Sequence, residues 1–156
     1  MAFFQWLQGS PLGTWVRESL WGFPLSLTVH AWAMGFLVGI SLLVALSVLG
    51  LAPRLLGPLL GHARRVIWFA FTFSLASGIF LISAYPEQPL TSPVFFSKMS
   101  LIALALFLLF SILRHPAVQP PRDEGKLPAT LRWRAAGILL CWFATISTGK
   151  LLYYTY

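Results

Sequence analysis

Residues 24–51 read PLSLTVHAWAMGFLVGISLLVALSVLGL and contain no Asp, Glu, Lys or Arg. A helix of about 20 apolar residues is long enough to cross the hydrocarbon core of a bilayer. No water is available there to satisfy backbone polar groups, so a stretch of this length and polarity predicts a membrane-spanning helix. The fold then depends on how many such stretches the chain contains and how they are connected.

Three further apolar stretches are long enough to span a membrane. They cover about 66–83, 93–113 and 135–154. Proline residues occur in each segment between the stretches, and proline ends helices because it has no backbone N–H to donate. We therefore predict an all-α fold, an integral membrane four-helix bundle that forms a single transmembrane domain over residues 1–156.

The overall composition also favours a membrane protein over a soluble one. Of the 156 residues, 58% are hydrophobic and 10% are charged, whereas a soluble domain has about 25% charged residues. A single cysteine excludes an internal disulfide. The sequence contains no phosphate-binding loop and no HExxH metal motif. It therefore carries no self-contained catalytic motif, and an enzymatic role would need a partner chain.

Basic residues are concentrated in two of the segments between the predicted spans. The segment 52–65 carries three arginines and no acid, and the segment 114–134 carries five basic residues against two acids. Basic loops usually lie in the cytoplasm. We therefore expect a multi-pass protein of the bacterial inner membrane with both termini in the periplasm. This topology accounts for most of the net charge of +7, so no nucleic-acid partner is predicted.

The N-terminal segment has the pattern of a short amphipathic helix. Ser10 and Pro11 are suited to the N-cap and the first helical position. Leu12, Trp15 and Val16 then repeat at helical spacing. We predict a helix over residues 11–21 that lies at the outer membrane interface.

Three ionisable residues lie inside the predicted spans, where such residues are costly and indicate function. These are His30, Lys98 and Lys150. Alternating helix directions and a rise of 1.5 Å per residue place them at similar depth in the outer half of the membrane. No Asp or Glu lies in any span to pair with them. These three residues together predict a binding site for an anion or another ligand. The alternatives are lysines that extend to the head groups and a histidine bonded to a neighbouring helix.

Small and soft residues surround these positions. Met34 lies four residues after His30 on the same helix face, and Gly35 and Gly39 form a G-x-x-x-G step. Ser77 and Gly78 form a similar small step in the second span. Such residues admit either a tightly packed helix or a flat cofactor. In the fourth span, core positions are predicted for Cys141 and Trp142.

Several short motifs resemble those of a group of small bacterial four-helix membrane proteins of unassigned function. The matching residues are Ser19-Leu20-Trp21-Gly22-Phe23-Pro24 with His30 and Gly35, then Ser77-Gly78, Phe96-Ser97-Lys98 and Gly149-Lys150. The chain is more distantly similar to the CopD-type copper-resistance proteins and the HemJ-type haem-pathway oxidases. The HemJ-type proteins are understood to bind haem b, which implies a haem site at His30 and Lys98. The longer HemJ-type motif around the histidine is missing, so haem-pathway chemistry is not implied.

These observations predict a membrane redox subunit that transfers electrons on the outer side of the membrane, within a larger complex. In a cytochrome b-like site His30 would be the metal ligand of haem b. The two lysines would bind its propionates or a quinone oxygen. The bilayer and other membrane subunits are the expected partners.

A non-catalytic accessory subunit is the main alternative, and copper handling by His30, Met34 and Met99 is a third. The predicted cofactor-binding residues are His30, Met34, Gly35, Lys98 and Lys150.

Overall fold

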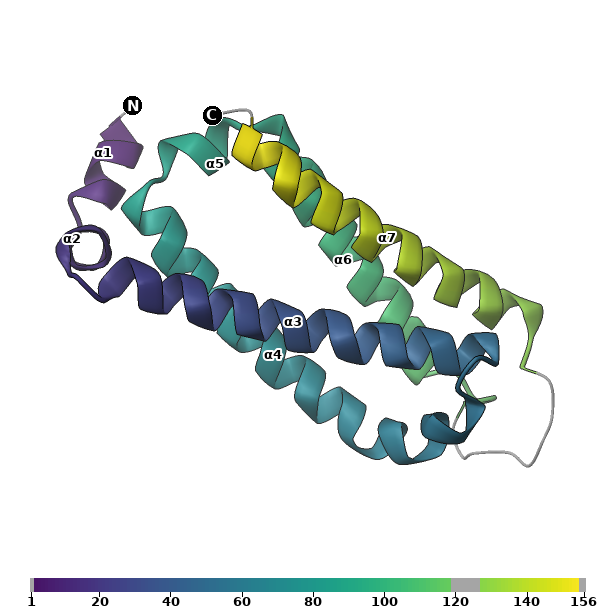
Figure 1. Cartoon of the computed structure of the whole chain (residues 1–156). Helices are drawn as coiled ribbons and strands as arrows, with labels where there is room; N and C mark the ends of the chain where they lie inside the picture. The colour runs from purple at the N-terminus through teal and green to yellow at the C-terminus, as the bar shows by residue number, and fades with distance from the viewer. Residues whose placement is uncertain (1, 119–126, 155–156) are drawn as a thin grey trace.

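Helices make up almost all of the part of the chain that the computed structural model describes, which is residues 2–118 and 127–154 (Figure 1). Side chains are described for 3–87, 89–118 and 127–148. Within these ranges there is no β-strand. The elements are α1 Ala2–Gln8, α2 Pro11–Glu18, α3 Gly22–Leu49, η1 Pro53–Leu55, α4 Leu56–Ala84, α5 Glu87–Thr91, α6 Pro93–Leu113 and α7 Ala129–Tyr154.

Three of the described helical segments are long and apolar enough to cross a membrane. They are Gly22–Leu49, Pro53–Ala84 and Pro93–Leu113. This confirms the prediction of an all-helical chain for the described residues, with segments that are candidates for spanning a membrane. The fourth expected span lies within α7, whose side chains beyond residue 148 fall outside the described residues. The count of four spans therefore stays a prediction.

The boundaries of the first two spans follow from local chemistry. Helix α3 ends at Gly50, which adopts φ of 88°, and its N–H reaches the carbonyls of Leu46 and Ser47. A left-handed residue of this kind commonly ends a helix, and glycine adopts it without strain. Helix α4 begins ten residues before the expected span of 66–83. The prolines of this segment predicted a connection, but Pro58 lies in the first turn of α4, where a missing N–H costs no hydrogen bond.

The N-terminal segment forms two short helices that pack against the end of α4. Ser10 caps α2 as predicted, because its hydroxyl accepts a hydrogen bond from the N–H of Gly13 at 3.1 Å. Helix α2 ends at Glu18 rather than at residue 21, and α1 was not predicted. Val16 of α2 is fully buried. The helix over residues 11–18 is thus confirmed, while its position at a membrane interface stays a prediction.

Gly13 lies against three carbonyl oxygens, and this contact predicts a large effect of a single methyl group. A Cβ at this position would lie 2.6 Å from the Ser83 carbonyl oxygen and 2.8 Å from that of Leu7. Gly13→Ala should therefore force α2 away from α4, at a cost of about 1–3 kcal/mol in the free energy of unfolding. The measurement is thermal unfolding in detergent followed by circular dichroism.

Gly35→Ala is the matched control for this substitution. A Cβ at Gly35 meets no atom within 4 Å, and alanine is a better helix former than glycine by about 1 kcal/mol. The control should unfold at the same temperature as the wild type or slightly higher. Equal unfolding temperatures for the two variants would contradict the described packing of α2 on α4.

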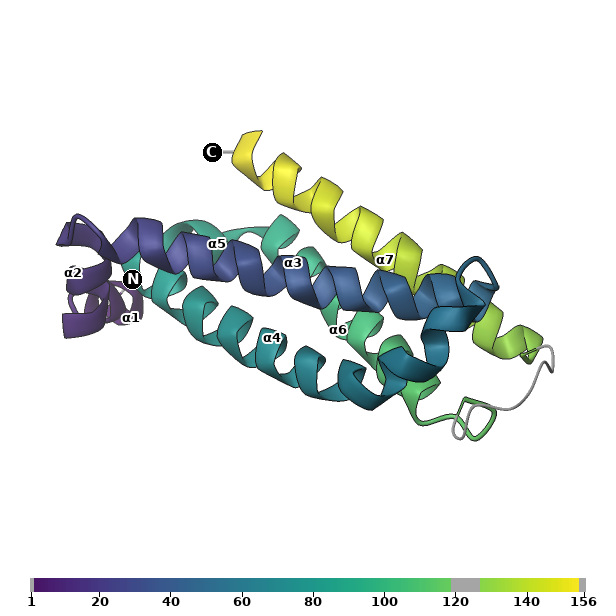
Figure 2. The same cartoon turned by 60° about the horizontal axis from the view of Figure 1, so that its bottom comes forward.

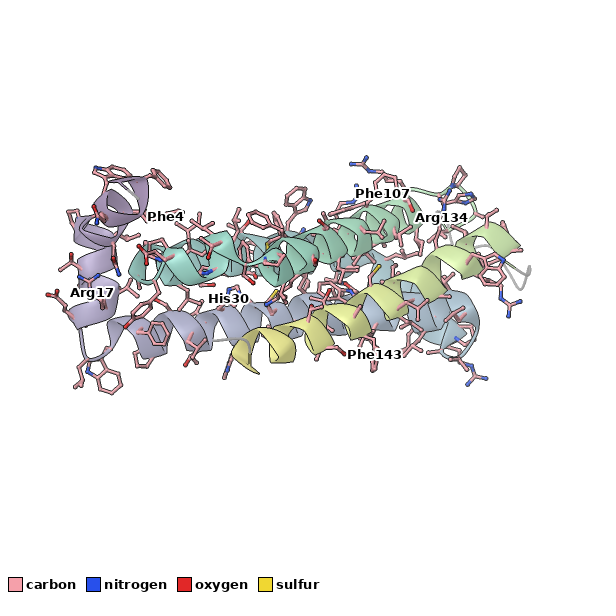
Figure 3. The ribbon with its side chains drawn as sticks, turned by 90° about the horizontal axis from the view of Figure 1, so that it is seen from above. Phe4, Arg17, His30, Phe107, Arg134 and Phe143 are labelled. Atoms are coloured by element: carbon pink, nitrogen blue, oxygen red, sulfur yellow. The ribbon has the colours of Figure 1, made fainter. Side chains whose placement is uncertain are left out.

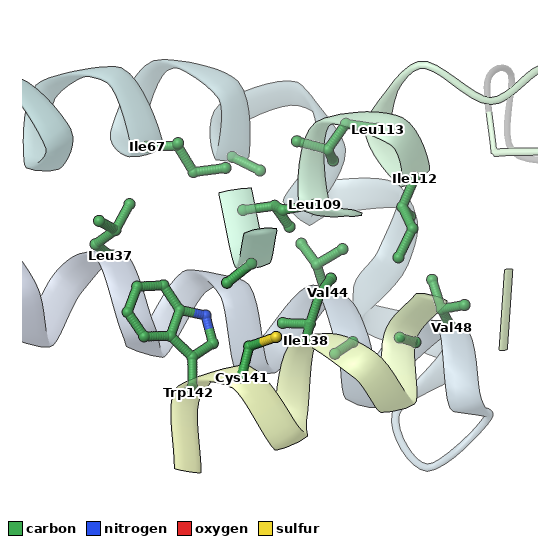
Figure 4. Close-up of a cluster of buried hydrophobic side chains, with 14 of the residues drawn as sticks. Leu37, Val44, Val48, Ile67, Leu109, Ile112, Leu113, Ile138, Cys141 and Trp142 are labelled. Carbon is green, nitrogen blue, oxygen red and sulfur yellow. The ribbon is translucent and has the colours of Figure 1, made fainter. Parts of the chain in front are cut away.

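The hydrophobic core occupies only one half of the bundle, where α4 and α7 begin. Leu37, Ile67, Leu109 and Trp142 are at most 1% exposed there and come from four different helices (Figure 4). Cys141 is also buried, so both residues that we predicted for the core are confirmed in it. Helices α3 and α7 pack together in this half and diverge toward the C-terminal end of α7 (Figures 1 and 2). The other half of α3, α4 and α6 is left without this core.

Large apolar side chains cover the outside of the helices. Trp32, Phe107 and Phe143 are 69%, 69% and 74% exposed, and the last two project outward from α6 and α7 (Figure 3). Exposed apolar surface of this extent is unfavourable in water. It is what a chain in contact with lipid presents, which agrees with the three candidate spans.

Candidate functional site

A cavity of about 370 Å³ lies between α3, α4 and α6 in the half of the bundle that faces α2. Its wall is mostly apolar, and Leu37 marks the point where it meets the hydrophobic core. The rings of Phe23 and Tyr85 meet edge to face at 5.8 Å between centroids and line the same cavity. The polar side chains that line it are His30, Ser74, Tyr85 and Lys98.

The imidazole of His30 is held by helix α4. Its Nδ1 lies 3.0 Å from the Ser74 carbonyl oxygen and 3.1 Å from the Ser77 hydroxyl oxygen. A carbonyl oxygen only accepts hydrogen bonds, so Nδ1 carries the proton and donates. The Ser77 hydroxyl itself donates to the Phe73 carbonyl at 2.6 Å, which leaves its oxygen free to accept from His30. The tautomer of a neutral His30 is therefore set by α4.

The other ring nitrogen, Nε2, has no hydrogen-bond partner among the described residues. With the proton on Nδ1, Nε2 presents a lone pair. A histidine that donates through one nitrogen to a carbonyl and offers the other is the usual arrangement of a metal ligand or a proton acceptor. Gly78 permits this placement, because a Cβ there would already lie 3.4 Å from Cε1 of the ring.

Lys98 contributes a cation to the same cavity from α6. Its side chain is half-buried, and the part of the structure with described side chains gives it no ion pair and no hydrogen bond. No Asp or Glu lines the cavity. A buried cation without a counter-ion favours a ligand that brings negative charge or an acceptor oxygen.

Two methionines and several aromatic rings complete the wall. Met34 lines the cavity from α3 and Met99 from α6. Phe71 and Phe95 line it as well, and sequence analysis did not single out these two rings. No pattern in the sequence marks these two rings, because a phenylalanine in a span has the same pattern whether it lines a cavity or faces lipid.

One of the predicted site residues is absent from this cavity, and another lies outside the described side chains. Gly35 does not line it. Because Gly35 follows His30 by five positions, it lies about 140° around the helix axis from His30. The side chain of Lys150 lies outside the described residues, so its predicted role stays a prediction. Ser77 and Gly78 do admit a close neighbour, and that neighbour is the His30 ring itself.

The remaining histidines lie at the other end of the bundle. His62 is exposed on the first turns of α4, and His115 follows the end of α6. Among the described residues, no three His, Cys, Asp or Glu side chains come together as a metal site would require. A metal at His30 would therefore need thioether, cofactor or exogenous ligands.

Comparison of the chain with protein-family models, curated proteins and solved structures finds no match. The resemblance to small four-helix membrane proteins and to CopD-type and HemJ-type proteins therefore stays a prediction. Function has to be argued from the geometry of the cavity.

Proposed function

We propose that the protein is a membrane redox subunit that binds a quinone head group in the cavity between α3, α4 and α6. The observation that carries this proposal is the unpartnered Nε2 of His30 in a cavity that it shares with the unpaired Lys98. A quinone has two oxygens on opposite sides of one ring. One polar side chain from α3 and another from α6 suit such a ligand.

The chemistry of the two side chains matches the reduced and oxidised forms of the ligand. A quinol hydroxyl donates to an unprotonated Nε2, while the ammonium of Lys98 donates to the second oxygen. Hydrogen bonds from a charged donor are the stronger kind. The aromatic rings that line the cavity offer flat apolar surface to the ring of the ligand. A volume of about 370 Å³ is near the lower end for small-molecule sites.

Quinol oxidation in this site would release two electrons and two protons. His30 accepts the proton of the hydroxyl that it binds, and the proton of the other hydroxyl passes to water. The electrons pass one at a time to a one-electron carrier, a haem or an iron–sulfur centre, in a partner chain. This requirement supports a role as one subunit of a larger complex.

Haem b is the alternative occupant of the same cavity. The donor set fits one axial bond, because His30 presents Nε2 and is oriented through Nδ1. Lys98 would then neutralise a propionate. The volume favours a single-ring head group over a macrocycle of four pyrroles, since about 370 Å³ is small for a site that must enclose so large a group.

Copper handling is a second candidate, favoured by one specific observation. His30, Met34 and Met99 line the same cavity, and imidazole with thioether sulfur suits Cu(I). The cation of Lys98 in the same wall opposes a bound metal ion through charge repulsion. Quinone binding uses Lys98, whereas copper binding has no use for it, so the quinone is the better fit.

The test is a set of three measurements on the purified protein in detergent. Isothermal titration calorimetry with a short-chain quinol, kept reduced, should show saturable binding at one site. The visible spectrum should show no Soret band, and elemental analysis should show no stoichiometric copper. A Soret band would show that the cavity binds haem instead of a quinone. Bound copper would show that the protein handles metal instead. Absence of all three signals would leave an accessory subunit as the function.

A further inference from the structure

A separate cleft lies at the other end of α4, outside the cavity that contains His30. It is an open hollow of about 580 Å³ on the surface of α4, and all of its lining residues, among them Arg64, Arg65, Trp68 and Thr72, belong to that helix. This is the end of the bundle where α4 and α7 begin and α6 finishes (Figure 1). Arg134 of α7 lies at this end as well, far from Arg17 and His30 (Figure 3).

The two arginines of the cleft are exposed and lack acidic partners. The ion pair that the described side chains form is Arg17–Glu18, at the opposite end of the molecule. Two adjacent guanidinium groups present planar forks of donors, which match the oxygens of a phosphate diester. Trp68, 54% exposed, lines the same cleft, and tryptophan is enriched against lipid head groups.

An apolar groove continues from the cleft along α3 and α4. It has a volume of about 510 Å³, and its wall includes Trp32, Phe36 and Val66. Phe69 and Phe73 line both the groove and the cleft, so the two spaces adjoin. At 1.5 Å per residue, Phe73 lies about 12 Å further along α4 than Arg65. The groove therefore leads from the arginines toward the middle of the span.

We propose that the cleft and the groove together bind one anionic phospholipid. Its phosphate lies at Arg64 and Arg65, and an acyl chain follows the groove past Phe69 and Phe73. The positive charge of the two arginines favours an anionic head group. The apolar wall of the groove favours a molecule that carries a long acyl chain on that head group. Basic residues near the end of a membrane helix attract anionic head groups in this way. The proposal does not depend on the occupant of the His30 cavity.

The experiment compares phosphatidylglycerol with phosphatidylcholine of the same acyl chains by native mass spectrometry of the detergent-purified protein. The wild type should prefer phosphatidylglycerol. The double variant Arg64→Gln/Arg65→Gln should bind it about 30-fold more weakly, since each basic residue contributes roughly fivefold. Binding of phosphatidylcholine should weaken much less, because its cationic choline offsets the charge of the same phosphate. Phe69→Ala/Phe73→Ala should weaken both lipids.

The matched control is Arg132→Gln/Arg134→Gln, which removes the same charge at the same end but outside the cleft and the groove. It should leave the preference intact, and an equal loss would show that only bulk charge matters. Equal binding of both lipids by the wild type would overturn the proposal. So would binding of glycerol 3-phosphate as tight as that of the lipid, because the groove would then have no role.

A second measurement covers the case in which the arginine double variant fails to fold. The preference of the wild type for phosphatidylglycerol should shrink as salt is raised to 1 M, because the Debye length falls to about 3 Å. A preference that persists unchanged at that salt concentration would contradict recognition by the two guanidinium groups.

Discussion

His30→Ala is expected to weaken the binding of a short-chain quinol by about 10- to 100-fold. The variant removes the Nε2 acceptor of the cavity, and leaving a buried ligand hydroxyl without its partner costs about 1–3 kcal/mol. Calorimetric titration of wild type and variant under the same conditions measures the change. Binding that is equally tight in both proteins would exclude His30 from the site.

The stability of this variant has to be measured alongside its affinity. His30 links α3 to α4 through its hydrogen bonds to Ser74 and Ser77, so its removal also lowers the free energy of unfolding by about 1 kcal/mol. Alanine is compatible with the helix, and the core cluster lies in the other half of the bundle. Helical content in detergent should therefore match that of the wild type.

His62→Ala is the matched control for the histidine. His62 is exposed on α4 at the opposite end of the bundle, so its removal should change neither quinol affinity nor unfolding temperature. Ser77→Ala tests the orientation of the ring separately. It removes one acceptor of Nδ1 and keeps the Ser74 carbonyl, so it should weaken binding less than His30→Ala. A larger loss than that of His30→Ala would show that Ser77 itself contacts the ligand.

Lys98→Met is expected to lower affinity for the same quinol by about 10- to 100-fold without lowering stability. A hydrogen bond from a charged donor contributes about 1.5–3 kcal/mol to binding. Methionine keeps much of the length and the apolar character of the lysine stem. Replacing a half-buried, unpaired cation removes its desolvation cost, so the unfolding temperature should stay the same or rise.

The two readouts of this variant separate a binding role from a structural one. If Lys98 only extends to the head groups, both affinity and stability should stay unchanged. A fall in unfolding temperature with intact binding would show that the ammonium supports the fold instead. Ser97→Ala is the control on the same turn of α6. Ser97 is exposed and its hydroxyl bonds to the Pro93 carbonyl, so neither readout should change.

The predictions from sequence were most successful where a feature depends on neighbouring residues. The cap of α2 needs only Ser10, Pro11 and the N–H of Gly13. Cys141 and Trp142 are buried as predicted, but their neighbours Leu140 and Phe143 are exposed, so position in an apolar stretch does not by itself decide burial. The predicted span of 66–83 missed the first ten residues of α4. Proline in the first turn of a helix does not end that helix, and the sequence pattern alone does not show where the first turn lies.

The candidate site could be predicted only in part. His30, Met34 and Lys98 were singled out because ionisable and soft side chains are rare in apolar stretches, and the structure brings the three to one cavity. Gly35 was included because its G-x-x-x-G step with Gly39 would admit a flat cofactor, yet it does not line the cavity. The rings of Phe71 and Phe95 were missed, since phenylalanine in a span carries no signal that distinguishes a cavity wall from a lipid-facing surface.

The sequence by itself determined that the chain is helical and apolar enough to span a membrane, because helix length and hydropathy depend on consecutive residues. Only the tertiary structure decided which nitrogen of His30 is free. That outcome depends on Ser74 and Ser77, which lie 44 and 47 residues further along the chain. It depends equally on the hydrophobic core filling one half of the bundle. Packing between helix faces leaves the other half open, and no local pattern along one helix specifies which faces will meet.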